Sequence, residues 1–75
     1  MAQVNIGAIV RDARKAAGLR QDELAASAGV GLRFVVELER GKPTARLDKI
    51  LQVLSALGLR MTVLPAHEDV GGPAA

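Results

Sequence analysis

The chain has 75 residues, of which 49% are hydrophobic, and a formal net charge of +2. A core of this size contributes only about 3–5 kcal/mol, so small domains commonly depend on disulfides, a metal or a partner chain. The absence of cysteine excludes disulfides and thiolate metal sites, and the single histidine, His67, has no second imidazole with which to share a metal. We therefore expect self-association and no cofactor.

The sequence contains neither a membrane-spanning pattern nor a catalytic one. No apolar run reaches the roughly 18–20 residues that cross a bilayer, and the N-terminus lacks the pattern of a secretory signal, which predicts a cytoplasmic protein with no membrane partner. With no cysteine, one histidine and no glycine-rich phosphate loop, the chain offers no plausible set of base, nucleophile and orienting group. An enzyme is therefore not expected.

Helical periodicity predicts a first helix from about Asn5 to Ala17, with Asn5 as its N-cap and Gly18 at its end. Its inward face is expected to carry apolar residues at three- and four-residue steps, namely Ile6, Ile9, Val10 and Ala13.

Two shorter helices are predicted next. The first runs from Gln21 to Ala28 and is ended by Gly29; the second runs from about Leu32 to Arg40. Val35 and Leu38 are expected to face inward from the latter, and Gly41 and Pro43 to stop it.

A fourth helix is predicted after Thr44, its expected cap, and Gly58 is expected to end it. Its apolar stripe consists of Leu47, Ile50, Leu51, Leu54 and Leu57. The tail from Glu68 to Ala75 has almost nothing to bury, and a flexible segment is expected there.

The residue pattern changes after Gly58 to a two-residue alternation that predicts a short strand, ended by Pro65. The expected strand residues are Leu59, Arg60, Met61, Thr62, Val63 and Leu64. A single strand has no hydrogen-bonding partner within a helical chain, so antiparallel pairing with a second copy is the favoured interpretation, which would bury Met61 and Val63. The alternative is an extended segment packed on its own core.

The second and third predicted helices have the spacing of a helix-turn-helix unit. Ala25 provides the small side chain where the helices would cross, Gly29 the turn, and Val30 and Val35 the packing beneath.

These residues resemble the lambda-repressor-like, Cro-type family of helix-turn-helix regulators over about residues 5–58. The resemblance lies in Gln21, Leu24-Ala25, Gly29-Val30 and the run Leu38 to Lys42. The continuation from Gly41 to Arg60 is similar to the HipB-like antitoxins, a branch with a C-terminal dimerisation strand. Two residues depart from the family pattern, because Arg20 and Gly31 stand where serine or threonine is usual.

The resemblance implies an all-α bundle of four to five helices with a short C-terminal strand that pairs in a dimer. It divides the chain into a DNA-binding domain (1–58), a dimerisation strand (59–66) and a flexible tail (67–75).

The resemblance also makes the third helix a recognition helix for the major groove. Its exposed positions would then be Leu32, Arg33, Val36 and Glu37. Arg33 suits guanine, Glu37 the cytosine amino group, and Leu32 or Val36 a thymine methyl group. The alternative for Arg33 and Glu37 is a solvated ion pair one helical turn apart.

Phosphate contacts are expected from residues that flank the recognition helix, namely Gln21, Arg40, Lys42 and Arg46. Each of the three cations could equally be plain surface charge, as is expected of Arg11, Lys15 and Arg20. Phe34, the only aromatic residue, is expected to pack rather than to stack on nucleic acid; its place in the first turn of the recognition helix leaves a contact with a thymine methyl group as the alternative. By the resemblance, Glu39 forms a largely buried salt bridge with Arg14.

The expected function is a repressor that binds double-stranded operator DNA as a homodimer. The HipB-like resemblance adds an antitoxin role, in which the protein represses its own operon and neutralises a HipA-like serine/threonine kinase toxin. Two alternatives remain: a stand-alone repressor without a toxin, and a protein-protein interaction module that does not bind DNA.

Overall fold

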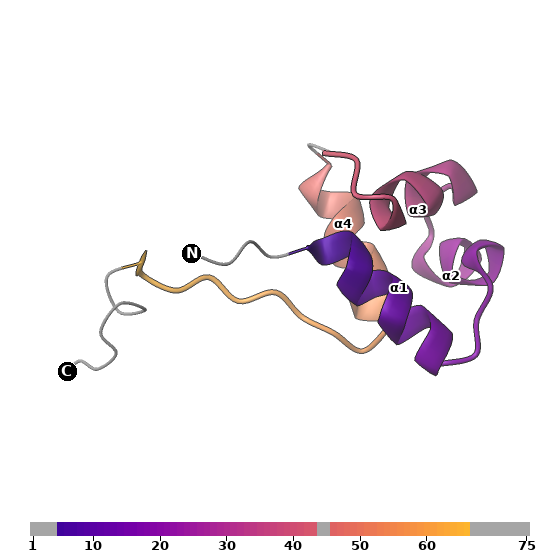
Figure 1. Cartoon of the computed structure of the whole chain (residues 1–75), viewed down its shortest axis with the longest axis horizontal. Coiled ribbons are helices and arrows are strands. Elements are labelled where there is room, and N and C mark those ends of the chain that lie inside the picture. The colour runs from indigo at the N-terminus through magenta and orange to yellow at the C-terminus, as the bar shows by residue number, and fades with distance from the viewer. Residues whose placement is uncertain (1–4, 44–45, 67–75) are drawn as a thin grey trace.

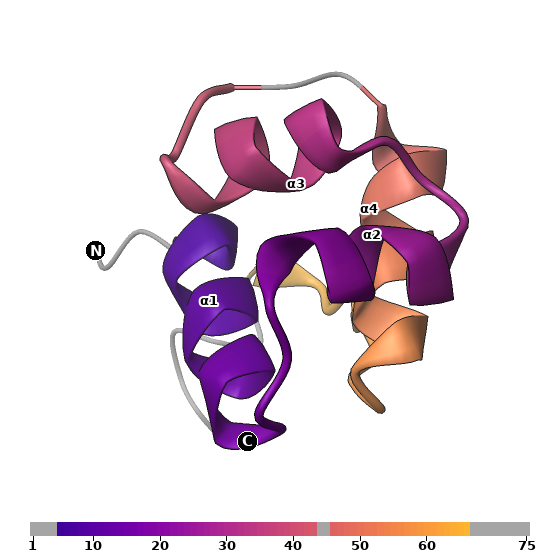
Figure 2. The same ribbon diagram turned by 90° about the vertical axis from the view of Figure 1, so that its right-hand side faces the viewer.

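The computed structural model describes residues 5–43 and 46–66, and within them the chain forms four helices and no strand. The helices are α1 (Ile6–Ala16), α2 (Gln21–Ala28), α3 (Leu32–Glu39) and α4 (Leu47–Ala56). Helix α2 packs on both α3 and α4, and α3 also packs on α1, as Figures 1 and 2 show. The all-helical fold that the sequence predicts is therefore confirmed.

The helix boundaries follow from their caps. The side chain of Asn5 accepts a hydrogen bond from the backbone N–H of Ala8 at 3.0 Å, which makes it the N-cap of α1 as predicted. Gly29 ends α2 in the left-handed conformation, with φ of 75°, which glycine adopts without strain. Helix α3 ends one residue earlier than predicted, because Arg40 is its C-cap. The predicted cap Thr44 lies outside the described residues, as does the tail from 67 to 75.

The core lies between the four helices, and among the described residues nine buried apolar side chains form it: Val10, Leu24, Ala25, Ala28, Val35, Leu38, Ile50, Val53 and Leu54. Val35 and Leu38 of α3 are buried as predicted.

The predicted inward face of α1 needs correction, because Ile9 is 48% exposed. The buried residues of this helix are Gly7, Val10 and Arg14. The buried face of α1 is turned toward α3. There the ion pair between Arg14 and Glu39 and the close contact of Gly7 with the α3 backbone take the place of the expected aliphatic packing.

The predicted stripe of α4 is also partly wrong. Leu47 and Leu51 are exposed, whereas Val53, which the stripe left out, is completely buried. Helix α4 packs mainly on α2, and that contact selects the side formed by Ile50, Val53 and Leu54.

The predicted strand segment is not a strand in the single chain. Leu59 packs against the core, but the residues after it run away from the helices as an extended segment, as Figure 1 shows. Val63 is 87% exposed and Leu64 is exposed as well. The alternative considered from the sequence, an extended segment packed on its own core, therefore does not hold for Val63 and Leu64.

Candidate functional site

Helices α2 and α3 are joined by a short turn around Gly29 and held at a fixed angle. The backbone N–H of Val30 donates to the carbonyl of Ala25 at 3.0 Å, which closes the end of α2. Ala25 and Val35 are buried between the two helices. Because one face of α3 packs on this support, the opposite face is presented to solvent.

The four residues predicted to contact bases lie on that outward face. Leu32 and Arg33 are exposed at the start of α3, and Val36 and Glu37 follow one turn later, half-buried. Residues four apart are neighbours on a helix surface, so the four form a single patch opposite Val35 and Leu38. The side chain of Arg33 is 89% exposed.

Glu37 lies between two cations. Its Oε2 accepts from Nε of Arg33 at 3.4 Å, and its Oε1 accepts from Nζ of Lys42 at 3.4 Å. The hydrogen bond from Lys42 lowers the pKa of Glu37 despite partial desolvation, and the charge of Lys42 and the pairing with Arg33 lower it further. The solvated pair considered from the sequence is thus the arrangement in the isolated chain, extended by a second cation.

The predicted phosphate-contact residues do not form one continuous cluster. Arg40 and Lys42 line a shallow depression at the end of α3 together with Glu37 and Gly41. Arg46, at the start of α4, pairs with Asp48 through Nη2 and Oδ2 at 2.9 Å. The amide of Gln21 turns inward and donates to Oε1 of Glu39 at 3.1 Å.

The structure brings Arg14 and Glu39 together in a bidentate ion pair. Nε of Arg14 lies 2.7 Å from Oε2 of Glu39, and Nη2 lies 2.9 Å from Oε1. The two side chains are only 10% and 3% exposed, respectively. A further N–H of Arg14 donates to the carbonyl of Leu19 at 2.8 Å, so this one side chain connects α1, the link to α2, and α3.

This network also shifts the pKa values of both Glu39 and Arg14. Desolvation alone would raise the pKa of Glu39, but the hydrogen bonds from Arg14 and Gln21 and the charge of Arg14 outweigh it and lower the pKa. The hydrogen bond to Glu39 raises the pKa of Arg14 against its own desolvation. The pair is therefore fully charged at neutral pH and supports α3 from behind.

Arg20, where the family pattern usually has serine or threonine, is the N-cap residue of α2. Its backbone N–H donates to Oε1 of Glu23 at 2.8 Å, and its guanidinium pairs with Asp22 at 3.0 Å. The carboxylate of Glu23, at the third helical position, thus satisfies the backbone N–H of the cap residue, which is the half of a capping box that needs no hydroxyl.

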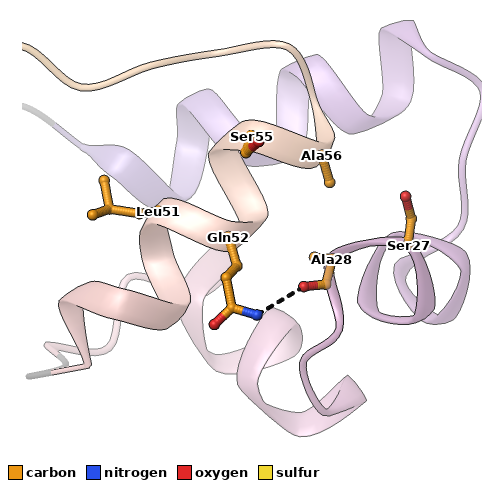
Figure 3. Close-up of a pocket in the computed structure, with 6 residues that line it drawn as sticks. All are labelled: Ser27, Ala28, Leu51, Gln52, Ser55 and Ala56. Atoms are coloured by element: carbon orange, nitrogen blue, oxygen red, sulfur yellow. Dashed lines mark hydrogen bonds between the residues drawn. The ribbon is translucent and has the colours of Figure 1, made fainter.

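Two contributions to the site's support were missed from the sequence. Nε2 of Gln52 on α4 donates to the carbonyl of Ala28 at 3.1 Å, which satisfies a C-terminal carbonyl of α2 (Figure 3). The ammonium of Lys49 lies 5.8 Å from the ring centre of Phe34, a cation-π contact that connects α4 to α3. Both cross between helices distant in sequence, so helical periodicity gives no signal for either.

An apolar groove lies on the side of the bundle where the extended segment begins. Its lining joins α1, α4 and the residues after them, namely Ile6, Ile9, Leu54, Leu59, Arg60, Met61 and Thr62. The exposure of Ile9 is explained by its position in this groove.

Within the described ranges, no cluster of histidine, cysteine and carboxylate side chains could hold a metal. None of the helices described is long and apolar enough to span a bilayer.

Comparison with known proteins agrees with this geometry. A family model described as helix-turn-helix matches residues 10–64. The chain is 59% identical over 64 residues to a protein of Sinorhizobium fredii (strain NBRC 101917 / NGR234) named as an uncharacterized HTH-type transcriptional regulator, y4mF. The match covers 85% of this chain and 84% of that protein.

Proposed function

Because this chain belongs to the helix-turn-helix family, we propose that it is a transcriptional regulator that binds double-stranded DNA in a sequence-specific manner. The observation that carries the proposal is the exposed patch at the start of α3, presented by a helix pair that the buried Arg14–Glu39 ion pair holds in place. The name of the S. fredii relative supports the regulatory role.

In this proposal α3 enters the major groove with its N-terminal residues closest to the bases. Arg33 presents its guanidinium to guanine O6 and N7, a contact that discriminates by about 1–3 kcal/mol. Leu32 and Val36 contact a thymine methyl group, and Glu37 accepts from a cytosine amino group.

The phosphate contacts proposed for Gln21, Arg40, Lys42 and Arg46 fix the register of α3 without reading sequence. Arg40 forms no ion pair within the described ranges, so it is available without rearrangement. To contact a phosphate, Lys42 leaves Glu37 and Arg46 leaves Asp48. Gln21 approaches the DNA backbone while its amide keeps its hydrogen bond to Glu39.

We also propose that the protein acts as a homodimer and represses transcription. The extended segment from Leu59 to Leu64 leaves apolar side chains in solvent beside the groove that contains Ile9. Pairing with the same segment of a second copy supplies the missing hydrogen bonds and brings two α3 helices to half-sites about one DNA turn, roughly 34 Å, apart.

The HipB-like resemblance extends the proposal to an antitoxin that represses its own operon and neutralises a HipA-like kinase. This role is tested by co-expression with the product of any neighbouring kinase-like reading frame. A complex that suppresses the kinase activity supports the antitoxin role, and a kinase that stays active and unbound leaves a stand-alone repressor.

The decisive experiment for DNA binding measures affinity for the DNA upstream of the coding region between 50 and 300 mM salt. We expect a steep loss of affinity, because each neutralised phosphate releases counterions with a slope of about −0.9 in log affinity against log salt. Arg33→Ala is expected to weaken binding by about 1–3 kcal/mol, whereas Lys15→Ala, at an exposed position of α1, serves as the matched control. A folded wild-type protein that ignores the duplex at 50 mM salt would instead favour the interaction module.

A further inference from the structure

Glu37 is an acid in the middle of a face that must approach a polyanion. Each of its carboxylate oxygens takes a different cation, Arg33 on one side and Lys42 on the other, at 3.4 Å in both cases. Its side chain is 34% exposed, against 89% for Arg33 and 61% for Lys42. The carboxylate is therefore less exposed than the two cations and accepts a hydrogen bond from each of them.

We propose that Glu37 is a specificity-determining residue that withholds Arg33 and Lys42 from sequence-independent phosphate contacts. The inference rests on the proposed DNA binding and adds a role for Glu37 in discriminating between DNA sequences. Phosphate contacts provide affinity for any duplex, so an acid that neutralises two cations lowers binding to random DNA. Specificity is the difference between two affinities, and a residue that weakens the wrong complex raises it.

The chemistry of the base edges explains how the restraint is relieved at the correct site. The cytosine amino group is a donor in the major groove, so it replaces a hydrogen bond that Glu37 received from a cation. That cation is then available to a phosphate. Guanine presents two acceptors at this edge, which repel the carboxylate, so guanine provides no such exchange.

The test compares the wild type with Glu37→Gln, which removes the charge and keeps the shape of the side chain. Two duplexes are used: one of random sequence, and one enriched from a randomised pool by the wild-type protein. At 0.1 M salt we expect Glu37→Gln to bind the random duplex about eightfold more tightly for each phosphate that a released cation neutralises, with a salt slope steeper by about 0.9 per phosphate. Affinity for the enriched duplex rises less, so the ratio of the two affinities falls.

Asp12→Asn is the matched control, because it makes the same change in net charge at an exposed position of α1 that forms no ion pair within the described ranges. The double variant Glu37→Gln/Lys42→Met identifies the released cation and is expected to lose much of the added affinity. Lys42→Met alone is expected to alter random binding less than it does in the Glu37→Gln background, since Lys42 is already occupied in the wild type.

The outcomes separate this inference from the proposed function. If the wild type binds DNA but Glu37→Gln and Asp12→Asn raise random binding equally, the effect is one of net charge and the role of Glu37 is overturned. An equal rise in affinity for both duplexes overturns it as well. If the folded wild type binds neither duplex at 50 mM salt, the proposed function fails, and the inference fails with it.

Discussion

Gly7 lies where the backbone of α1 meets the end of α3. Figure 2 shows the start of α1 next to this end of α3. A Cβ atom built on Gly7 would overlap the carbonyl oxygen of Leu38 and lie 3.2 Å from its carbonyl carbon. These atoms belong to backbone, which cannot rotate away as a side chain can. The residue is therefore a glycine because of close packing between helices, although glycine is a poor helix former.

Gly7→Ala is accordingly expected to destabilise the fold by about 1–3 kcal/mol, the usual cost of overpacking, despite the helix propensity that alanine adds. Thermal unfolding followed by circular dichroism measures the effect. Gly31→Ala makes the same chemical change where no atom lies within 4 Å of the added Cβ, and it is expected to shift stability by less than about 1 kcal/mol. Equal effects of the two variants would contradict the packing argument.

The Arg14–Glu39 pair gives a prediction about pH. Since the pKa of Glu39 is lowered in the fold, the pair stabilises the protein above the ordinary carboxylate pKa of 4.5, and this contribution is lost as pH falls through the lower pKa of the folded state. Glu39→Gln is expected to cost about 3 kcal/mol at pH 7, the lower end for breaking a buried pair, because the amide oxygen still accepts one hydrogen bond. The difference from wild type should shrink below pH 4.5.

Urea unfolding at pH 7, 5 and 3 measures this difference, and Asp12→Asn is the control with no ion-pair partner in the described ranges. A cost for Glu39→Gln that stays constant from pH 7 to pH 3 would show that the carboxylate charge does not stabilise the fold. DNA binding is expected to weaken together with stability, although Glu39 is buried against Arg14 and is not among the residues proposed to contact DNA.

At the scale of the helices, the sequence predicts ends better than faces. The helix ends at Asn5, Gly29 and Gly41 depend on the residue itself and its nearest neighbours in sequence. The observed helix ends therefore agree with the predicted ones to within about a residue. The buried faces depend on which helix packs against which, and this is why Ile9 and Leu51 were assigned to the core and are exposed. Periodicity treats any apolar stripe as inward, and it cannot detect a buried arginine.

Gln52 shows how one helix end depends on another helix. Its amide caps the carbonyl of Ala28, so Gln52→Glu replaces the donor with a charge beside the negative end of the α2 dipole. We expect a loss of about 1–2 kcal/mol at pH 7, combining the lost hydrogen bond with this repulsion. Below the carboxyl pKa, near 4.3, the protonated side chain can donate again and part of the loss is recovered. Unfolding experiments that find no loss at pH 7 would exclude this capping role.

At the scale of the molecule, the exposed apolar residues are unevenly distributed. Ile9 and Met61 line one groove, and Val63 and Leu64 extend beyond it without a backbone hydrogen bond to the described part of the bundle. A chain of this size buries only a small hydrophobic core. A second copy that covers these side chains would therefore stabilise the fold, and it would also position two recognition helices. Dimerisation and stability are therefore expected to change together.

Val63→Glu tests this coupling, because in a two-strand ribbon it places like charges close to the two-fold axis. We expect the mass in native mass spectrometry to fall from two chains to one, the thermal midpoint to become independent of protein concentration, and DNA affinity to decrease because a single half-site remains. Ala26→Glu is the control, since it adds the same charge at an exposed position of α2 that belongs neither to the groove nor to the extended segment. If Val63→Glu remains a dimer with unchanged DNA affinity, the copies associate through another surface; a wild-type monomer at micromolar concentration would remove the paired strand altogether.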